Sequence, residues 1–366
     1  MKVAIVAPGG LDPSGERRVI PALLWLIERL SREAEVHAFT LAPVESGGTY
    51  TLRGATVHAV GPHLARAASA IRAEHARGRF QVIHAFWATH PAYVALPLGG
   101  LLGAPVMVHI AGGELASLPD IDYGGVRTWR GRAAMRAVLR SASVVTGASR
   151  GIIESAARLG CRAVRVPLGV ARDAWPPCPP RARDTSRPAR LIHVASLNRV
   201  KDPFTLIRAL RLVADRGTSF SLDVAGEDTL QGAVADAAHQ AGLADCITFH
   251  GFRTQGELRP MVLAADVMVI SSRHEAGPIA ALEAAVSGVA VAGTAVGHLA
   301  EWAPHAAAVA PPGDAEALAH AIDGLLRDET RRLAIAGAAQ EHSMSEDADF
   351  TASRVMGLYR EMAAAR

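Results

Sequence analysis

The chain of 366 residues has few cysteines and no long apolar run. Its three cysteines, Cys161, Cys178 and Cys246, are far apart and form no Cys-x-x-Cys pair, which argues against a disulfide framework or a zinc site. No stretch reaches the ~18 uninterrupted apolar residues of a spanning helix. The opening residues are too short for a signal peptide and are expected to form a strand. We therefore expect a cytoplasmic protein.

Two nucleotide-binding signatures are also missing. No Gly-x-Gly-x-x-Gly follows an expected strand, which argues against a two-domain dehydrogenase, and no Walker-type phosphate loop occurs. One Asp-x-Asp is present, Asp120-Ile-Asp122, a spacing that can hold a metal on a nucleotide sugar. Pro119 and Gly124-Gly125 flank it, so we interpret these aspartates as loop carboxylates. We expect no metal site, no cofactor and no nucleic-acid partner.

Lysine is nearly absent: Lys2 and Lys201 are the only lysines among 38 basic residues. Lys201 follows the strand-like run 191–196, at an expected strand-to-helix turn. The lysine ammonium is a compact point charge on a flexible stem, which suits it to reach a phosphate. A lysine kept at such a turn in an arginine-rich chain is a candidate phosphate contact.

The segment 274–284 carries two carboxylates, Glu275 and Glu283, just after an apolar strand-like run. Gly277 and Pro278 between them indicate the start of a helix, and Pro278 suits its first position. Free amides near Gly277 and Ile279 favour an anion, although proline contributes none. Carboxylates repel phosphate and are better used to bind hydroxyl groups. The segment therefore predicts a site for a ligand that is part phosphate and part polyol.

Apolar strand-like runs alternate with amphipathic stretches, which favours an α/β fold with parallel sheets. In the first half, the expected strands lie near 2–8, 35–40, 55–60, 82–86, 105–111, 143–148 and 162–168. In the second half, they lie near 191–196, 220–226, 246–251, 266–272, 289–293 and 306–310. Helices are expected near 17–32, 314–327, 328–342 and 346–364.

A proline- and arginine-rich stretch divides these two sets of strands. We predict an N-terminal domain over 1–172, a linker over 173–189 and a second domain over 190–345. The residues 346–366 form the last helix.

The net charge of +3 hides an asymmetry between the halves. Residues 1–188 hold 23 Lys+Arg and 13 Asp+Glu, giving +10, and residues 189–366 hold 15 and 22, giving −7. Arg132, Arg136 and Arg140 recur every four residues and would form one stripe on a helix. Our hypothesis is a peripheral contact between this stripe and an acidic acceptor or anionic lipid headgroups. The alternative is a solvated helix face.

At the lysine turn and the Glu-x7-Glu element, the chain resembles the retaining, GT-B-fold glycosyltransferases of family 4 (glycosyl transferases group 1). Looser similarities are Gly9-Gly10 after the first strand, Val166–Val170 before the linker, and His250-Gly251 after a later strand. The resemblance covers nearly the whole chain. It implies two Rossmann-like domains facing a central cleft, with the last helix crossing back onto the N-terminal domain.

The resemblance also implies roles for the charged residues. Lys201 would neutralise the diphosphate of a nucleotide sugar, Glu283 would accept hydrogen bonds from the ribose hydroxyls, and Glu275 would bind the donor sugar. We take Glu275 and Lys201 as the catalytic candidates. The family usually has an arginine five residues before the lysine, where this chain has Ser196, and Arg199 in the same turn is the candidate replacement.

Further substrate-binding candidates depend on weaker matches. They are Gly9, Gly10, Gly277, Pro278, Ile279, Gly251, Phe252, Ser196 and, on the acceptor side, Glu114. Ala111 stands where the family often has a histidine, so that role is not transferred, and His109 is interpreted as a core residue. His84, Trp87 and His90 could contact a sugar or simply pack in the core.

Taken with the resemblance, these residues indicate a metal-independent, retaining glycosyltransferase. The donor would be a nucleotide diphosphate sugar. The acceptor would be a hydroxyl-bearing saccharide, lipid-linked sugar or small-molecule glycoside. Two alternatives stay open: a nucleotide-sugar 2-epimerase on the same fold, and a non-catalytic module that binds nucleotide sugars.

Overall fold

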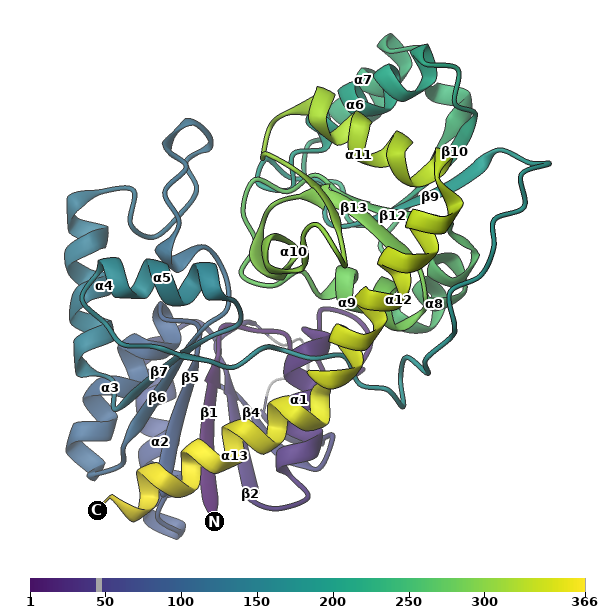
Figure 1. Ribbon diagram of the computed structural model, residues 1–366. Helices are drawn as coiled ribbons and strands as arrows, with labels where there is room; N and C mark the ends of the chain where they lie inside the picture. The colour runs from purple at the N-terminus through teal and green to yellow at the C-terminus, as the bar shows by residue number, and fades with distance from the viewer. Residues whose placement is uncertain (44–47, 366) are drawn as a thin grey trace. The chain divides into compact units, whose positions relative to one another are not determined.

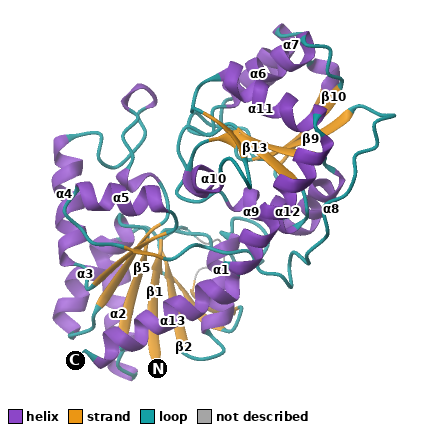
Figure 2. Cartoon of the chain, in the orientation of Figure 1, coloured by secondary structure: helices purple, strands orange, loops and turns teal. Residues whose placement is uncertain are grey.

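A computed structural model describes residues 1–43 and 48–365, and the chain divides into two compact units. Unit 1 comprises Met1–Gly169 and Ala348–Arg366, and unit 2 comprises Val170–Asp347. Each unit is a largely parallel sheet flanked by helices (Figures 1 and 2). The prediction of two Rossmann-like α/β domains is confirmed.

Unit 1 contains an eight-stranded sheet in the order β3-β4-β2-β1-β5-β6-β7-β8. Its strands are β1 Lys2–Ala7, β2 Glu35–Thr40, β3 Gly48–Leu52, β4 Ala55–Ala59, β5 Val82–Phe86, β6 Val106–Ile110, β7 Val144–Gly147 and β8 Val164–Arg165. Its helices are α1 Pro21–Leu30, α2 Leu64–Arg77, α3 His90–Leu102, α4 Trp129–Ser141, α5 Arg150–Arg158 and α13 Ala348–Ala364.

The edge strand β3, which runs antiparallel to β4, was not predicted from the sequence. Most of its residues face solvent, so it lacks the apolar signal of a buried strand. Arg53 and Gly54 both have positive φ (50° and 82°), which makes the tight turn that joins the two strands. The helix expected over 17–32 is shorter in the structure, where α1 begins at Pro21, because proline favours the first position of a helix.

Unit 2 contains a six-stranded parallel sheet in the order β11-β10-β9-β12-β13-β14. Its strands are β9 Ala189–Val194, β10 Phe220–Ala225, β11 Ile247–Gly251, β12 Val267–Ile270, β13 Ala290–Thr294 and β14 Ala308–Ala310. Its helices are α6 Pro203–Asp215, α7 Ala233–Gln240, α8 Gln255–Ala264, α9 Ile279–Val286, α10 Gly297–Trp302, α11 Ala315–Arg327 and α12 Glu329–Ser345. The strand order reverses between β9 and β12, the place where open α/β sheets bind ligands.

The segment 173–189, expected to be a linker, packs along unit 2. Trp175 is only 1% exposed. The Arg181 guanidinium donates hydrogen bonds to the carbonyls of Leu263 and Ala265, at the end of α8. Gln340 on α12 donates to the carbonyl of Cys178. These contacts fix the segment to unit 2.

Helix α13 belongs to unit 1, although it follows unit 2 in the sequence, and it packs against α1 (Figure 1). Thr351 accepts a hydrogen bond from the Gly169 amide and donates one to the Pro167 carbonyl. The Tyr359 hydroxyl is hydrogen-bonded to His84 Nδ1 on β5, at 2.7 Å, and both side chains are fully buried.

We expect Tyr359→Phe to lower the stability of unit 1 by about 1–3 kcal/mol, because His84 would keep a buried nitrogen without a partner. Urea unfolding followed by circular dichroism measures the loss. Tyr93→Phe, which removes a half-exposed hydroxyl from α3, serves as the control. Equal midpoints for the two variants would contradict a stabilising role for the Tyr359 hydrogen bond.

Candidate functional site

Two loops meet at the carboxyl ends of β9 and β12, where the strand order of unit 2 reverses. The β9 loop is shaped by Asn198, whose side-chain oxygen accepts hydrogen bonds from the amides of Val200 and Lys201. Asp202 then caps α6 by accepting from the Thr205 amide, and its φ of 47° turns the chain into the helix. Lys201 therefore lies just before a well-capped helix.

The two loops are joined by hydrogen bonds. Ser271 Oγ donates to the Lys201 carbonyl at 2.8 Å, and the Arg273 amide donates to the Val200 carbonyl at 2.7 Å. Thr294, at the end of β13, donates to the Ser272 carbonyl. The backbone around Lys201 and the Glu275 loop is thus held in one arrangement.

A cavity of about 260 Å³ lies between these loops. Its polar lining includes His193, Lys201, Ser272 and Glu275, and its floor includes Gly277, Pro278 and Ile279. Lys201 Nζ lies 2.5 Å from Glu275 Oε1, which also accepts a hydrogen bond from Ser272 Oγ at 2.6 Å. The structure therefore brings together the two residues predicted to be catalytic.

The cavity floor departs from the prediction in one respect. Pro278 precedes the helix, and α9 begins at Ile279. Pro278 offers no side-chain cap to α9, and Ile279 and Ala280 at the start of the helix line the cavity. Gly297 packs closely against Pro278, since a Cβ at position 297 would lie 2.9 Å from the Pro278 side chain. The glycine thus permits the close packing that fixes the Gly277-Pro278 turn.

Glu283 lies one turn beyond Ile279 on α9 and is only 3% exposed. Burial raises the pKa of its carboxyl from 4.5 to about 7, and the nearby Gln255 side chain opposes that rise. Its Oε1 has no partner among the described residues. Glu283 is not among the residues that line the cavity, so its contact with a ligand stays a prediction.

Gln255 and Trp175, which are hydrogen-bonded to each other, were missed by the sequence analysis. Gln255 is the first residue of α8, and its Oε1 accepts a hydrogen bond from the Trp175 indole at 2.5 Å. The capping box formed by Thr254 and Glu257 was the available signal, since it predicts where α8 begins. No sequence pattern predicts that the side chain of Gln255 bonds to Trp175, 80 residues away.

His193 on β9 was also not predicted as a site residue, because it is a single polar residue within an apolar strand-like run. Its Nδ1 is hydrogen-bonded to the Val269 carbonyl at 2.9 Å, and its Nε2 has no partner among the described residues. Burial lowers the pKa of its imidazole. The cavity wall therefore contains a neutral histidine beside the Lys201–Glu275 pair.

Four other candidates of unit 2 lie outside the lining of this cavity. Ser196 and Arg199 are exposed on the loop that carries Lys201. Gly251 ends β11 with φ of 65°, and Phe252 is 47% exposed on the following loop. Their contacts with a ligand stay predictions.

The candidates of unit 1 follow β1 and β6. Gly10, after Gly9, has φ of 80°, and a Cβ there would lie 2.4 Å from Ile20. Glu114 is buried and accepts hydrogen bonds from the amides of Ala88, Ala111 and Gly112, at 2.6–3.2 Å. Burial raises the pKa of its carboxyl. Glu114 holds the backbone around β6 in place, and a direct contact with an acceptor stays a prediction.

Three histidines of the first half take different positions. His109 is buried, as interpreted, and its Nδ1 is hydrogen-bonded to Thr146. Burial lowers the pKa of His109 and that of His84 to about 3. His84 is bonded to Tyr359 in the core, whereas His90 begins α3 beside Tyr93. His84 and His90 therefore do not form one sugar-binding cluster.

The aspartates of the Asp-x-Asp lie in a short turn. Asp122 has φ of 54°, and its exposed carboxylate accepts a hydrogen bond from Arg127 at 2.8 Å. Asp120 is part of the 3₁₀ turn Pro119–Ile121. This arrangement agrees with loop carboxylates.

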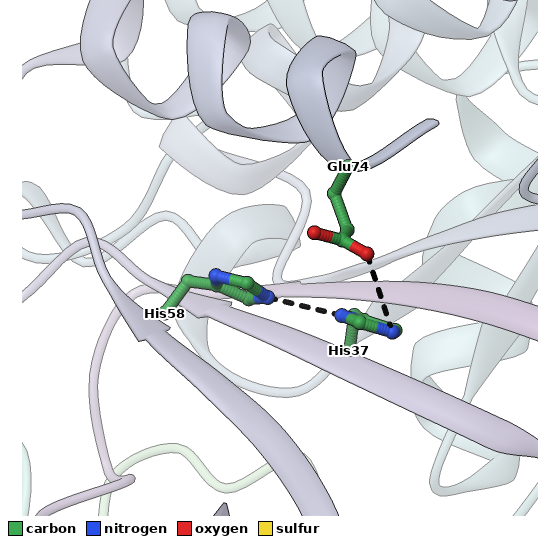
Figure 3. Close-up of side chains that lie close together, drawn as sticks. All are labelled: His37, His58 and Glu74. Carbon is green, nitrogen blue, oxygen red and sulfur yellow. Dashed lines mark hydrogen bonds and ion pairs between the residues drawn. The ribbon is translucent and has the colours of Figure 1, made fainter. Parts of the chain in front are cut away.

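A separate cluster, His37, His58 and Glu74, lies between β2, β4 and α2 (Figure 3). His37 Nδ1 and His58 Nε2 are hydrogen-bonded at 3.0 Å. Lys2 Nζ lies 2.9 Å from Glu74 and 3.3 Å from Glu35, so the ammonium already neutralises these carboxylates. A divalent ion here would face that positive charge, which argues against a metal site.

Helix α4 carries the arginine stripe as expected. Arg132, Arg136 and Arg140 are exposed, whereas Met135 and Val138, on other faces of the helix, are buried. Trp129, at the start of the helix, is 68% exposed, and the Arg130 guanidinium lies over its ring. No helix within residues 1–43 and 48–365 has the length and hydropathy required to cross a membrane.

Comparison with known proteins matches both units to glycosyltransferase domains. Residues 181–342 match the glycosyl transferases group 1 model, and residues 19–169 match the glycosyl transferase 4-like domain. A D-inositol 3-phosphate glycosyltransferase from Corynebacterium urealyticum is 29% identical over 178 residues, or 46% of this chain and 42% of that protein. The chain spans less than half the length of the curated relatives that it matches.

Solved structures share the fold over the whole chain. Sucrose-phosphate synthase from Thermosynechococcus elongatus has a TM-score of 0.84 and 20% identity, covering 100% of both chains. Anabaena HepE in complex with UDP-glucose has a TM-score of 0.73 and 18% identity, covering 99% of this chain and 100% of that one. The architecture is therefore GT-B. Since the two glycosyltransferase models match most of each unit, the chain belongs to the glycosyl transferases group 1, family 4.

Proposed function

We propose that the chain transfers a glycosyl group from a nucleotide diphosphate sugar to a hydroxyl acceptor, with retention and without a metal ion. The observation that carries this proposal is the contact between Lys201 and Glu275 in the cavity at the strand-order reversal. In this contact a cation suited to phosphate lies beside a carboxylate suited to hydroxyl groups. Anabaena HepE has been solved in complex with UDP and with UDP-glucose, which supports a nucleotide-sugar donor.

The Lys201–Glu275 pair suits a ligand that contains both a diphosphate and a sugar. Lys201 is 26% exposed in its side chain and Glu275 13%, so both are reachable from the cavity. An entering diphosphate would take Lys201 as its counterion, assisted by the free amides of α9. Glu275, still held by Ser272, would then accept hydrogen bonds from the sugar hydroxyls.

In the transfer step, the bond between the anomeric carbon and the diphosphate oxygen breaks, and its electron pair stays on that oxygen. Lys201 stabilises the charge that develops there. The acceptor hydroxyl bonds to the anomeric carbon on the same face of the sugar. Its proton passes to the departing phosphate oxygen, so the step requires no protein nucleophile.

Two alternatives use the same donor cavity: a nucleotide-sugar 2-epimerase and a non-catalytic binding module. Incubation with a panel of nucleotide sugars and hydroxyl acceptors separates them. A transferase releases nucleoside diphosphate and yields a glycoside whose anomeric configuration is read by proton NMR. A C2-epimer or glycal would establish the epimerase. Binding without any conversion across the panel would favour the module.

Catalysis is expected to continue in excess chelator, because Lys201 and the α9 amides supply the positive charge that a metal would otherwise provide. Nucleotide release measured with and without EDTA tests this. Complete loss of activity that manganese or magnesium restores would contradict metal independence. Asp120→Asn with Asp122→Asn would then show whether the loop carboxylates hold the ion.

We further propose that the arginine stripe on α4 binds anionic lipid headgroups peripherally. Three like charges on one helix face repel one another, and an anionic surface removes that cost. Each basic residue near such a surface contributes about 1 kcal/mol, and salt weakens the attraction. The exposed Trp129 at the start of the helix suits a position among headgroups.

We expect the chain to sediment with anionic vesicles at low salt, and to be released at high salt or from neutral vesicles. A triple alanine variant of Arg132, Arg136 and Arg140 should lose this binding. Arg66→Ala with Arg72→Ala, which removes two exposed charges from α2, is the control. If the chain did not bind anionic vesicles at low salt, or if both variants lost vesicle binding equally, the stripe would be a solvated helix face without a lipid-binding role.

A further inference from the structure

Helix α3 of unit 1 is apolar even on the side that faces solvent. Its 13 residues include no lysine, no arginine and no acidic residue. Tyr93 is 42% exposed and Leu101 67%, and Pro97 and Gly100 between them are exposed as well. These four positions follow one another at the spacings that place side chains on one side of a helix. We call them the apolar face of α3.

Such a face is unusual on a surface helix. The solvent side of an amphipathic helix normally carries charged and polar residues, and a helix that is apolar all round is normally buried. No residue in the described part of the chain covers Tyr93 or Leu101. Contiguous exposed apolar residues mark a surface that contacts a protein partner or a membrane. The apolar face of α3 is therefore a candidate contact surface.

Helix α4, with the arginine stripe, packs beside α3 (Figure 1). The stripe residues Arg132, Arg136 and Arg140 are exposed, and Trp129 at the start of the helix is 68% exposed. Neither α3 nor α4 contains an acidic residue. An apolar helix face and a cationic helix thus lie next to each other, and neither helix offers the arginines a counterion.

The apolar surface continues past the exposed residues into a cavity of about 650 Å³. Its lining includes Leu96 and Gly100 of α3, Ser141 at the end of α4, and Met362 of α13. A Cβ at Gly100 would meet no atom within 4 Å, so the cavity is open at this position. Glu361 also lines it and would repel an anionic headgroup. The cavity therefore suits the end of an acyl chain and not a phosphate.

This combination favours a lipid bilayer over a second copy of the chain. An isologous interface places the same patch of two copies together, and the α3 and α4 helices of one copy would offer the arginines of the other no acidic partner. An anionic bilayer offers phosphates to the arginines and hydrocarbon to the apolar face. Trp129 and Tyr93 are of the aromatic types that gather where headgroups meet hydrocarbon.

We propose that the apolar face of α3 inserts among the acyl chains of an anionic membrane, next to the headgroups that the arginine stripe binds. This inference rests on the lipid contact within the proposed function and adds a hydrophobic component to it. A helix of 13 residues is shorter than the ~20 residues that span a bilayer, so α3 lies along the membrane plane. One helix face buries little apolar area, so high salt still releases the chain.

Two variants remove the apolar face and leave the arginines in place. Leu101→Ser replaces its most exposed side chain, and Gly100→Asp adds a charge at a position where a new Cβ causes no clash. At low salt, we expect Leu101→Ser to weaken binding to phosphatidylcholine–phosphatidylserine vesicles about tenfold, and Gly100→Asp to weaken it by more than about tenfold. The wild type should raise the surface pressure of a monolayer of these lipids, and both variants should raise it much less.

Each variant has a matched control in unit 2. Phe249→Ser removes a 38% exposed side chain from β11. Gly256→Asp adds the same charge at an exposed glycine of α8, where a Cβ also meets no atom within 4 Å. Both controls should bind vesicles and raise the surface pressure nearly as the wild type does. Circular dichroism and urea unfolding check that all four variants keep the fold.

Vesicle binding without any rise in surface pressure would limit the contact to headgroups and overturn the insertion of α3. Equal effects of Leu101→Ser and Phe249→Ser would overturn it as well. A dimer in sedimentation velocity that Leu101→Ser dissociates would show that the face contacts a second copy instead.

The outcomes also separate this inference from the rest of the proposed function. A wild-type chain that binds no anionic vesicles at low salt would overturn the lipid contact of the arginine stripe together with the insertion of α3. Glycosyl transfer to soluble acceptors is measured without lipid, so its failure would overturn the proposed transfer and leave the membrane results unchanged.

Discussion

Lys201→Ala is expected to weaken nucleoside diphosphate binding roughly 10- to 100-fold and to change nucleoside binding by less than about twofold. The difference arises because the lost contact is to phosphate, while the base and ribose keep theirs. Turnover should fall further, on the order of 100- to 1000-fold, since the charge on the leaving diphosphate grows in the transition state. Calorimetry with UDP and uridine, and nucleotide release from the donor, measure both effects.

Arg208→Ala is the control for this loss of charge, because Arg208 is exposed on α6 and lies outside the cavity lining. It should bind UDP as the wild type does. Lys201→Arg keeps the charge but replaces a compact ammonium by a planar group, so we expect partial recovery of binding. Equal losses for nucleoside and nucleoside diphosphate in Lys201→Ala would remove Lys201 from the phosphate site.

Glu283→Gln is expected to stabilise the folded chain at pH 8 while it weakens nucleotide binding. Burial raises the pKa of Glu283 from 4.5 to about 7. Between these values the folded chain keeps a proton that the unfolded chain has lost, so stability falls as the pH rises through this window. At pH 8 the cost is on the order of 3 kcal/mol, and most of it is gone at pH 5.

Urea unfolding of both chains between pH 5 and pH 8 tests this expectation. The wild type should lose stability with rising pH, and Glu283→Gln should lose less. Its UDP affinity should nevertheless be lower at pH 8, because an amide is a weaker acceptor for hydroxyls than a carboxylate. Glu275→Gln should instead mainly reduce turnover of the intact donor. Parallel stability profiles for wild type and Glu283→Gln would show that the carboxyl does not titrate in this range.

The main site was predictable because its residues stand out along the chain. Lys201 is a rare residue type at a strand-to-helix turn, and Glu275 follows a strand that is apolar throughout. Parallel strands bring their carboxyl ends to one edge, so the two loops had to meet somewhere along it. Their 2.5 Å contact follows from β9 and β12 being neighbours, which sequence spacing does not specify.

The other residues described around the site were not predictable, because sequence spacing does not specify contacts between distant segments. Gln255 and Trp175 are 80 residues apart and meet only after the packed segment and α8 have docked. Nothing in the local pattern distinguishes this glutamine from a solvated one. Strand β3 was missed because an edge strand with exposed threonines carries little apolar periodicity. The sequence does not show whether the Glu114 carboxylate is available to a ligand or, as in the structure, hydrogen-bonded to backbone amides.

Helix α13 gives the chain an unusual order of assembly. Unit 2 is continuous in sequence, whereas unit 1 needs residues 348 onward to complete its core. Val355, Met356 and Tyr359 belong to the same apolar cluster as β1 and α1. During synthesis the first 169 residues therefore emerge with part of their core uncovered. The later unit can finish folding before the earlier one, which reverses the usual vectorial order and exposes the nascent first half to chaperones the longest.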